Sequence, residues 1–222
     1  MNRPSDLPAS NHYATNKQAI LSQEYRFLYP RSAISEAFLG PAVQAAGKAM
    51  KQKNLYDPVA TMTGVPWWVV ACLHHMECDA NPAGGIDNGD PWNKATVHVP
   101  AHRGPYASFE AEAVDALLQY QKPENWGVHL TGRNWNDPGW VFWFLESWNG
   151  FGARQDRGGQ TTPPHAPAYL YNGAEMNHVP LYLKGKDTSD FHFDPEARSS
   201  QVGCFAFMLA LEQAFGKVLA TY

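Results

Sequence analysis

Apolar residues recur at three- and four-residue intervals in several stretches of the chain, and this spacing predicts amphipathic helices. One such helix should begin after residues 63–66 (Thr-Gly-Val-Pro), because a proline suits the first turn of a helix. It should end near Cys78, since residues 79–85 (Asp-Ala-Asn-Pro-Ala-Gly-Gly) form a dense run of helix breakers. A second helix, over residues 140–148, is apolar on nearly all sides, which indicates a central helix buried in the core.

Further helices are predicted from signals at their ends. Residues 34–53 are rich in alanine and are interrupted at Gly40-Pro41, which predicts one kinked helix or two short ones. Ser108 is a favourable N-cap, and Pro123 should end the helix that Ser108 starts. We expect a last helix to begin at Asp194-Pro195 and to close near Gly216, so the chain should be mostly helical.

The remaining segments predict irregular structure and a little β-structure. Residues 1–30 are polar without a clear period, so we expect an N-terminal arm ahead of a single domain over residues 31–222. Residues 86–99 are rich in turn formers and end in an alternating run, which predicts a small β-hairpin. Residues 153–190 predict a long loop. The expected fold class is α+β, predominantly α-helical.

Composition and charge narrow the range of partners. Hydrophobic residues make up 44% of the 222 residues and charged residues 17%, which is typical of a globular protein with a full core. The net charge of -4 and the short basic runs argue against nucleic acid and against an anionic membrane surface. We find no signal peptide, no apolar run of roughly 20 residues and three cysteines that we expect to be reduced. These features predict synthesis in the cytoplasm without a membrane anchor.

Glu77 is the residue with the strongest chemical signal. It lies in the last turn of the apolar helix, just before the chain enters a polar segment. Apolar burial and the negative end of the helix dipole should both raise the pKa of this carboxyl group. A carboxyl group that stays protonated near neutral pH is the main requirement for cleaving a glycosidic bond, because the leaving oxygen must be protonated.

Three polar residues follow Glu77 within the length of one hairpin: Asp87, Asp90 and Thr96. A second carboxylate across a cleft could hold a water molecule or stabilise an oxocarbenium charge, and a threonine hydroxyl could orient that water. Turn formation explains the two aspartates equally well, because residues 87–91 (Asp-Asn-Gly-Asp-Pro) are all turn formers. The choice between Asp87 and Asp90 therefore stays open.

Several segments resemble the lysozyme-like superfamily. Residues 64–71 (Gly-Val-Pro-Trp-Trp-Val-Val-Ala), followed by Met76-Glu77-Cys78, resemble its catalytic helix, which ends on the acid glutamate. Residues 148–152 (Trp-Asn-Gly-Phe-Gly) resemble a segment that lytic transglycosylases and goose-type lysozymes place beside the bound sugar. Glu77, Asp90 and Thr96 are spaced similarly to the Glu–Asp–Thr triad of one class of phage lysozymes, with a longer first gap. Residues 88–100 resemble bacterial and phage peptidoglycan hydrolases of the lysozyme family.

This resemblance implies a lysozyme-like fold with a β-hairpin beside the active-site cleft, and a muramidase that cleaves the β-1,4 bond between N-acetylmuramic acid and N-acetylglucosamine. Glu77 would protonate the glycosidic oxygen, while Asp90 with Thr96 would position the attacking water. The substrate-binding residues that it implies are Asn149, Trp148, His98, Tyr169 and Tyr171. The partner would be peptidoglycan or a chitin-like strand, bound by a monomer without cofactor. A bacteriolytic phage endolysin, released by a holin, would fit these expectations.

Three alternatives remain. A lytic transglycosylase would cleave the same bond, although Cys78 stands where those enzymes usually have serine and their Gly-Leu-Met-Gln strand is missing. A zinc-dependent wall amidase would use histidines and cysteines near Glu77, but no His-Glu-x-x-His helix occurs and His74 and His75 point about 100° apart. A saccharide-binding protein without catalysis would suit the eight tryptophans.

Overall fold

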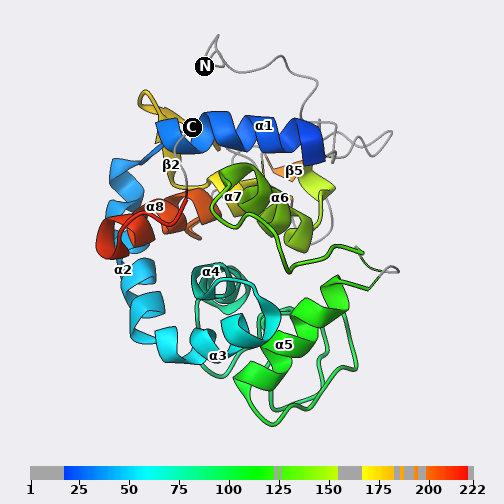
Figure 1. Ribbon diagram of the computed structural model, residues 1–222. Helices are drawn as coiled ribbons and strands as arrows, with labels where there is room; N and C mark the ends of the chain where they lie inside the picture. Colours follow the sequence, from blue (N-terminus) through cyan, green and yellow to red (C-terminus); the bar gives the residue numbers. More distant parts are fainter. Residues whose placement is uncertain are drawn as a thin grey trace. The chain divides into compact units, whose positions relative to one another are not determined.

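The computed structural model of the chain describes residues 18–122, 125, 127–154, 167–182, 186–187, 193–194 and 199–219 (Figure 1). The chain divides into two compact units. We call Gln44–Trp135 the contiguous unit, and Met1–Val43 together with Asn136–Tyr222 the split unit.

The contiguous unit contains the helices α3 (Lys53–Thr63), α4 (Trp67–Cys78) and α5 (Phe109–Tyr120). The split unit contains α1 (Gln18–Leu28), η2 (Tyr29–Arg31), α6 (Pro138–Asn149), η3 (Gly152–Arg154), α7 (Ala168–Tyr171) and α8 (Cys204–Phe215). Helix α2 (Glu36–Lys51) crosses the boundary between the units. The strands are β1 (Ala33–Ile34), β2 (Ala174–Met176), β3 (Val179–Pro180), β4 (Lys186–Asp187) and β5 (Phe193–Asp194).

The strands form two small antiparallel sheets. β1, β2 and β3 form one sheet in that order, with Ala33 opposite Glu175 and Glu175 opposite Pro180. β4 pairs with β5. The protein is therefore mostly helical with a small antiparallel sheet, which confirms the α+β, predominantly helical fold class.

Helix α6 forms the centre of the split unit. Its residues from Pro138 to Ser147 are all buried, as the uniformly apolar sequence predicts. The ring of Phe142 packs 4.2 Å from the ring of Phe205 on α8 and 4.8 Å from that of Tyr29. Asp137 is the N-cap of this helix, because its side chain accepts a hydrogen bond from the Gly139 N–H.

A buried polar network lies beside this aromatic core. The Arg154 guanidinium, fully enclosed, contacts the carboxylates of Glu146 on α6 and Glu24 on α1. Tyr25 donates to Glu146, and Tyr171 donates to Glu24 over 2.5 Å. The network thus joins α1, α6, η3 and α7 through charged hydrogen bonds.

Helix α4 forms the centre of the contiguous unit. Its residues from Trp68 to Met76 are all buried, and α4 and α5 both pack against α3. His74 is a structural core residue: its Nδ1 lies 3.0 Å from the Tyr56 hydroxyl and its Nε2 lies 2.8 Å from the Asn81 carbonyl. Burial lowers the pKa of His74 to about 4, so the imidazole is neutral.

The predicted helix ends are confirmed at several positions. α4 ends at Cys78, with Asp79 in the left-handed conformation (φ 54°). The Ser108 side chain accepts a hydrogen bond from Ala111, so Ser108 is the N-cap of α5. α8 ends before Gly216. Helix α2 runs through Gly40-Pro41 as one helix, because a single proline removes only one backbone donor.

Two predicted boundaries are wrong. The N-terminal arm was expected to be irregular, but residues 18–28 form α1, whose Leu21 and Tyr25 are fully buried; residues 1–17 lie outside the described part of the chain. The last helix begins at Cys204 with Gly203 as N-cap, while Asp194 belongs to β5. The expected loop over 153–190 contains α7 and two strands of the three-stranded sheet.

The β-hairpin predicted over residues 86–99 is also wrong. Residues 81–108 are all described, and their β-structure consists of one isolated bridge between Gly84 and Pro91. The backbone N–H groups of Val97 and His98 donate to the Asp90 side chain instead of to a partner strand. A carboxylate therefore replaces the strand pairing that the alternating pattern suggested.

Candidate active site

Glu77 lies where the buried helix α4 meets an irregular loop. It is the penultimate residue of α4 and is half-buried, at the end where the helix dipole is negative. The loop over residues 79–108, which we call the bracing loop, returns to this helix end. A Cβ atom on Gly89 would lie only 2.4 Å from the Glu77 carbonyl oxygen, so the loop backbone packs directly against Glu77.

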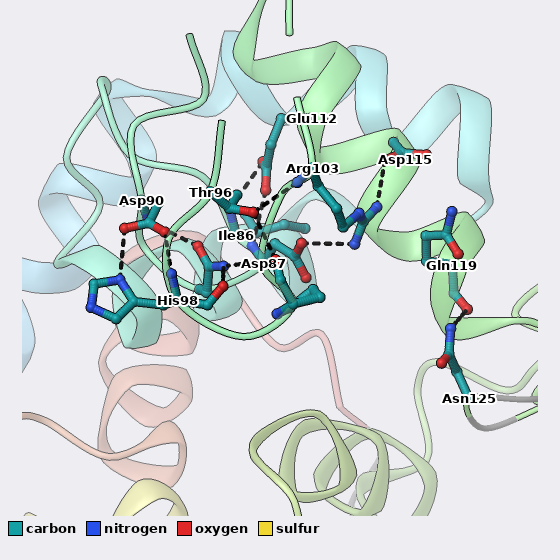
Figure 2. A network of polar contacts seen from close by, with 12 residues as sticks. Ile86, Asp87, Asp90, Thr96, His98, Arg103, Glu112, Asp115, Gln119 and Asn125 are labelled. Carbon is teal, nitrogen blue, oxygen red and sulfur yellow. Dashed lines mark hydrogen bonds and ion pairs between the residues drawn. The ribbon is translucent and has the colours of Figure 1, made fainter. Parts of the chain in front are cut away.

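Asp90 organises the tip of the bracing loop. Its Oδ2 accepts hydrogen bonds from the backbone N–H groups of Val97 (2.7 Å) and His98 (2.9 Å), and its Oδ1 lies 2.7 Å from His98 Nδ1 (Figure 2). The residue is only 8% exposed. The His98 N–H makes the largest contribution to lowering the pKa of Asp90, so the carboxylate is ionised at neutral pH.

The Thr96 hydroxyl bonds to the backbone of its own loop. It donates to the Pro100 carbonyl (2.7 Å) and accepts from the Arg103 N–H (3.0 Å). The Asn88 side-chain amide donates to the His98 carbonyl over 3.1 Å. Asp90, Thr96 and His98 are thus brought together in one loop, where Asp90 and Thr96 bond to loop groups.

Asp87 lies in a more strongly charged environment. Its Oδ2 accepts a hydrogen bond from Arg103 Nη1 (2.7 Å), and Arg103 also pairs with Asp115 on α5. Burial raises the pKa of Asp87 to about 6, although the Arg103 charge opposes this shift. Asp87 is therefore a carboxylate that can exchange protons near neutral pH.

Glu112 on α5 is a site residue that the sequence interpretation missed. Its two carboxylate oxygens accept hydrogen bonds from the backbone N–H groups of Ile86 and Asp87, each over 3.0 Å (Figure 2). It is 2% exposed, and burial raises its pKa to about 7. A Cβ atom on Gly85 would lie 2.4 Å from the Glu112 carboxyl carbon, so the loop follows the carboxylate closely. Helical spacing was the sequence signal that could have identified Glu112, because it lies on the buried face of α5 with Phe109, Ala113 and Ala116.

The other predicted binding residues belong to the split unit. Asn149 is exposed at the end of α6, while Trp148 and Tyr169 are half-buried. Tyr171 is buried, with its ring 4.9 Å from that of Phe205 and its hydroxyl donating to Glu24. The prediction that Tyr171 lines a substrate groove is therefore wrong, because its ring and hydroxyl are both used inside the core.

The described residues contain no group of three or more His, Cys, Asp or Glu residues arranged to hold a metal ion. Within the same residues, no helix has the length and apolar character needed to cross a membrane. Comparisons of the chain with protein-family models, curated proteins and solved structures found no match.

Proposed function

We propose that the chain is a glycoside hydrolase of the lysozyme type, which cleaves β-1,4 bonds of peptidoglycan with Glu77 as general acid. The observation that carries this proposal is the position of Glu77. Glu77 is a half-buried residue at the C-terminal end of the buried helix α4, and a braced polar loop packs against its backbone. A carboxyl group in this position is the general acid that cleavage of a glycosidic bond requires.

Asp87 is the better supported second carboxylate. Three of the roughly four acceptor positions of the Asp90 carboxylate are already used within the loop, which leaves little capacity for a water molecule. Asp87 has a pKa of about 6. Its Oδ2 accepts the hydrogen bond from Arg103. A base with a pKa just below neutral is ionised at pH 7 and still accepts a proton readily. We therefore assign Asp87 to the attacking water, and Asp90 with Thr96 to holding the loop.

The test is the Glu77→Gln variant, assayed on purified peptidoglycan with products identified by mass spectrometry. We expect the rate to fall by at least about 100-fold, because a general acid typically contributes that much or more. Glu36→Gln is the matched control, since Glu36 is an exposed glutamate at the start of α2. Asp87→Asn should reduce kcat in the same assay more than Asp90→Asn does.

The products discriminate between the related functions. Reducing sugar ends support a hydrolase, whereas 1,6-anhydro ends would mean a lytic transglycosylase and freed peptides an amidase. Saccharide binding by the wild-type protein without any cleavage would mean a binding protein. Full activity of Glu77→Gln would contradict the assignment of the acid.

A further inference from the structure

Val97, His98 and Val99 protrude from the bracing loop, and we call them the loop tip. Val97 is 76% exposed and Val99 is 88% exposed, although both side chains are apolar. The His98 side chain between them is 72% exposed. Exposed apolar side chains on either side of a polar one offer a ligand both van der Waals contact and a hydrogen-bonding group.

The loop tip is held in place from both sides. Asp90 accepts the N–H groups of Val97 and His98, while the Asn88 amide donates to the His98 carbonyl. The Thr96 hydroxyl closes the base of the tip by donating to the Pro100 carbonyl. The exposed side chains are thus presented on a fixed backbone, which reduces the entropy lost when a ligand binds.

Asp90 also determines which nitrogen of His98 carries the proton. An ionised carboxylate can only accept hydrogen bonds, so the 2.7 Å contact between Asp90 Oδ1 and His98 Nδ1 requires a proton on Nδ1. In the neutral ring, Nε2 is then a hydrogen-bond acceptor. Figure 2 shows His98 and Asp90 on one side of the network, with Arg103 and Asp115 on the other.

We propose that the loop tip recognises the N-acetylated sugar strand, with His98 Nε2 accepting a hydrogen bond from a sugar hydroxyl or acetamido N–H group. Val97 and Val99 contact the apolar face of a sugar ring beside it. This inference rests on the proposed function, and the loop tip belongs to the same bracing loop as Gly89, which packs against the Glu77 backbone carbonyl. Asp90 is then a positioning residue for His98.

The test measures binding to the Glu77→Gln protein, so that cleavage does not interfere. The probes are the hexamer of β-1,4-linked N-acetylglucosamine and a soluble peptidoglycan hexasaccharide, titrated by calorimetry. His98→Asn keeps a side-chain donor near Asp90 but removes Nε2, and we expect it to weaken binding of at least one probe about five- to tenfold. Val97→Thr, which has nearly the same shape, should weaken binding by a smaller factor.

His102→Asn is the matched control. His102 is exposed in the same loop at φ 65°, a conformation that asparagine adopts readily. The His102→Asn variant should therefore bind both probes with the affinity of the parent protein. In the protein with Glu77 intact, His98→Asn should raise KM and leave kcat within about twofold. Unchanged affinity in His98→Asn, a loss confined to kcat, or no binding of either probe by the parent would each overturn the inference. Retained cleavage by Glu77→Gln would contradict the proposed function alone, because binding is measured separately.

Discussion

Carboxylates of the contiguous unit differ in their chemistry because of the groups around them. Asp90 accepts three hydrogen bonds from one loop, and its pKa is lowered. Glu112 also accepts two backbone N–H groups, but its deeper burial dominates and raises its pKa. Residue type alone therefore does not decide which carboxylate is ionised; the balance between burial and hydrogen bonding does.

Glu112 should make stability depend on pH. Its pKa rises from the ordinary 4.5 to about 7 in the folded chain, so the unfolded chain loses this proton at lower pH than the folded one. Stability from this group is fully present below pH 4.5 and is lost as the pH rises through about 7, on the order of 3 kcal/mol in total. Urea unfolding between pH 4 and 8 should show this change in the wild type, relative to Glu112→Gln.

Glu110→Gln serves as control, because it removes a glutamate from the first turn of the same helix. If the stability difference between the wild type and Glu112→Gln were the same at every pH, the raised pKa of Glu112 would be refuted. Asp87 titrates in an overlapping pH range. The test of Glu112 is therefore the difference in stability between the wild type and Glu112→Gln, and not the wild-type curve alone.

At the site, the sequence predicted where a residue lies on its element better than it predicted which groups that residue bonds to. The helix end that carries Glu77 could be predicted because breakers directly follow it. The role of Asp90 could not, because its partners are N–H groups seven and eight residues further along an irregular loop. The role of Glu112 could not be predicted either, because it depends on burial on one face of α5 and on loop N–H groups 25 and 26 residues away.

Among the elements, helices with local end signals were predicted best. α4 and α5 begin or end at residues with a recognisable capping or breaking role, and those ends are confirmed. α1 was missed because its polar residues are stabilised by tertiary contacts: Ser22 donates to the Gly139 carbonyl, and Arg26 pairs with Asp137. Such contacts have no local sequence signature.

The buried network around Arg154 should be a major source of stability for these elements. Arg154→Met would leave Glu24 and Glu146 buried without their cation, and we expect the free energy of unfolding to fall by about 3–5 kcal/mol. Urea unfolding measures this change. Arg31→Met is the control, since Arg31 is exposed and should cost less than about 1 kcal/mol. Equal losses in the two variants would contradict the structural role of the network.

At the scale of the whole molecule, the two units are built from the chain in different ways. The contiguous unit uses one stretch of sequence, whereas the split unit joins residues from before and after it. No local signal in the sequence marks this division, because helix α2 crosses the boundary without a break. The proposed acid Glu77 and the bracing loop both belong to the contiguous unit.

Core mutations should act mainly on the unit that contains them. Cys204 is buried in the split unit and Cys72 in the contiguous unit, so the labelling rate of each thiol reports the opening of its own unit. Leu21→Ala should speed labelling of Cys204 and Leu117→Ala that of Cys72, each by roughly 30-fold or more, because a buried Leu→Ala change costs about 2–5 kcal/mol. Peptide mass spectrometry after timed labelling measures both rates. Equal acceleration of both thiols by either variant would mean that the units open as one.

The glycines of the bracing loop restrict which sequences can encode it. Side chains at Gly84, Gly85 or Gly89 would collide with Cys78 Sγ, with Glu112 or with the Glu77 backbone, at 2.4–2.7 Å from a Cβ atom. In a random-mutagenesis library selected for function, these three positions should therefore be nearly invariant, while exposed helix positions such as Met62 vary freely. This loop therefore tolerates few substitutions at its glycines, because neighbouring atoms occupy the space that a side chain would need.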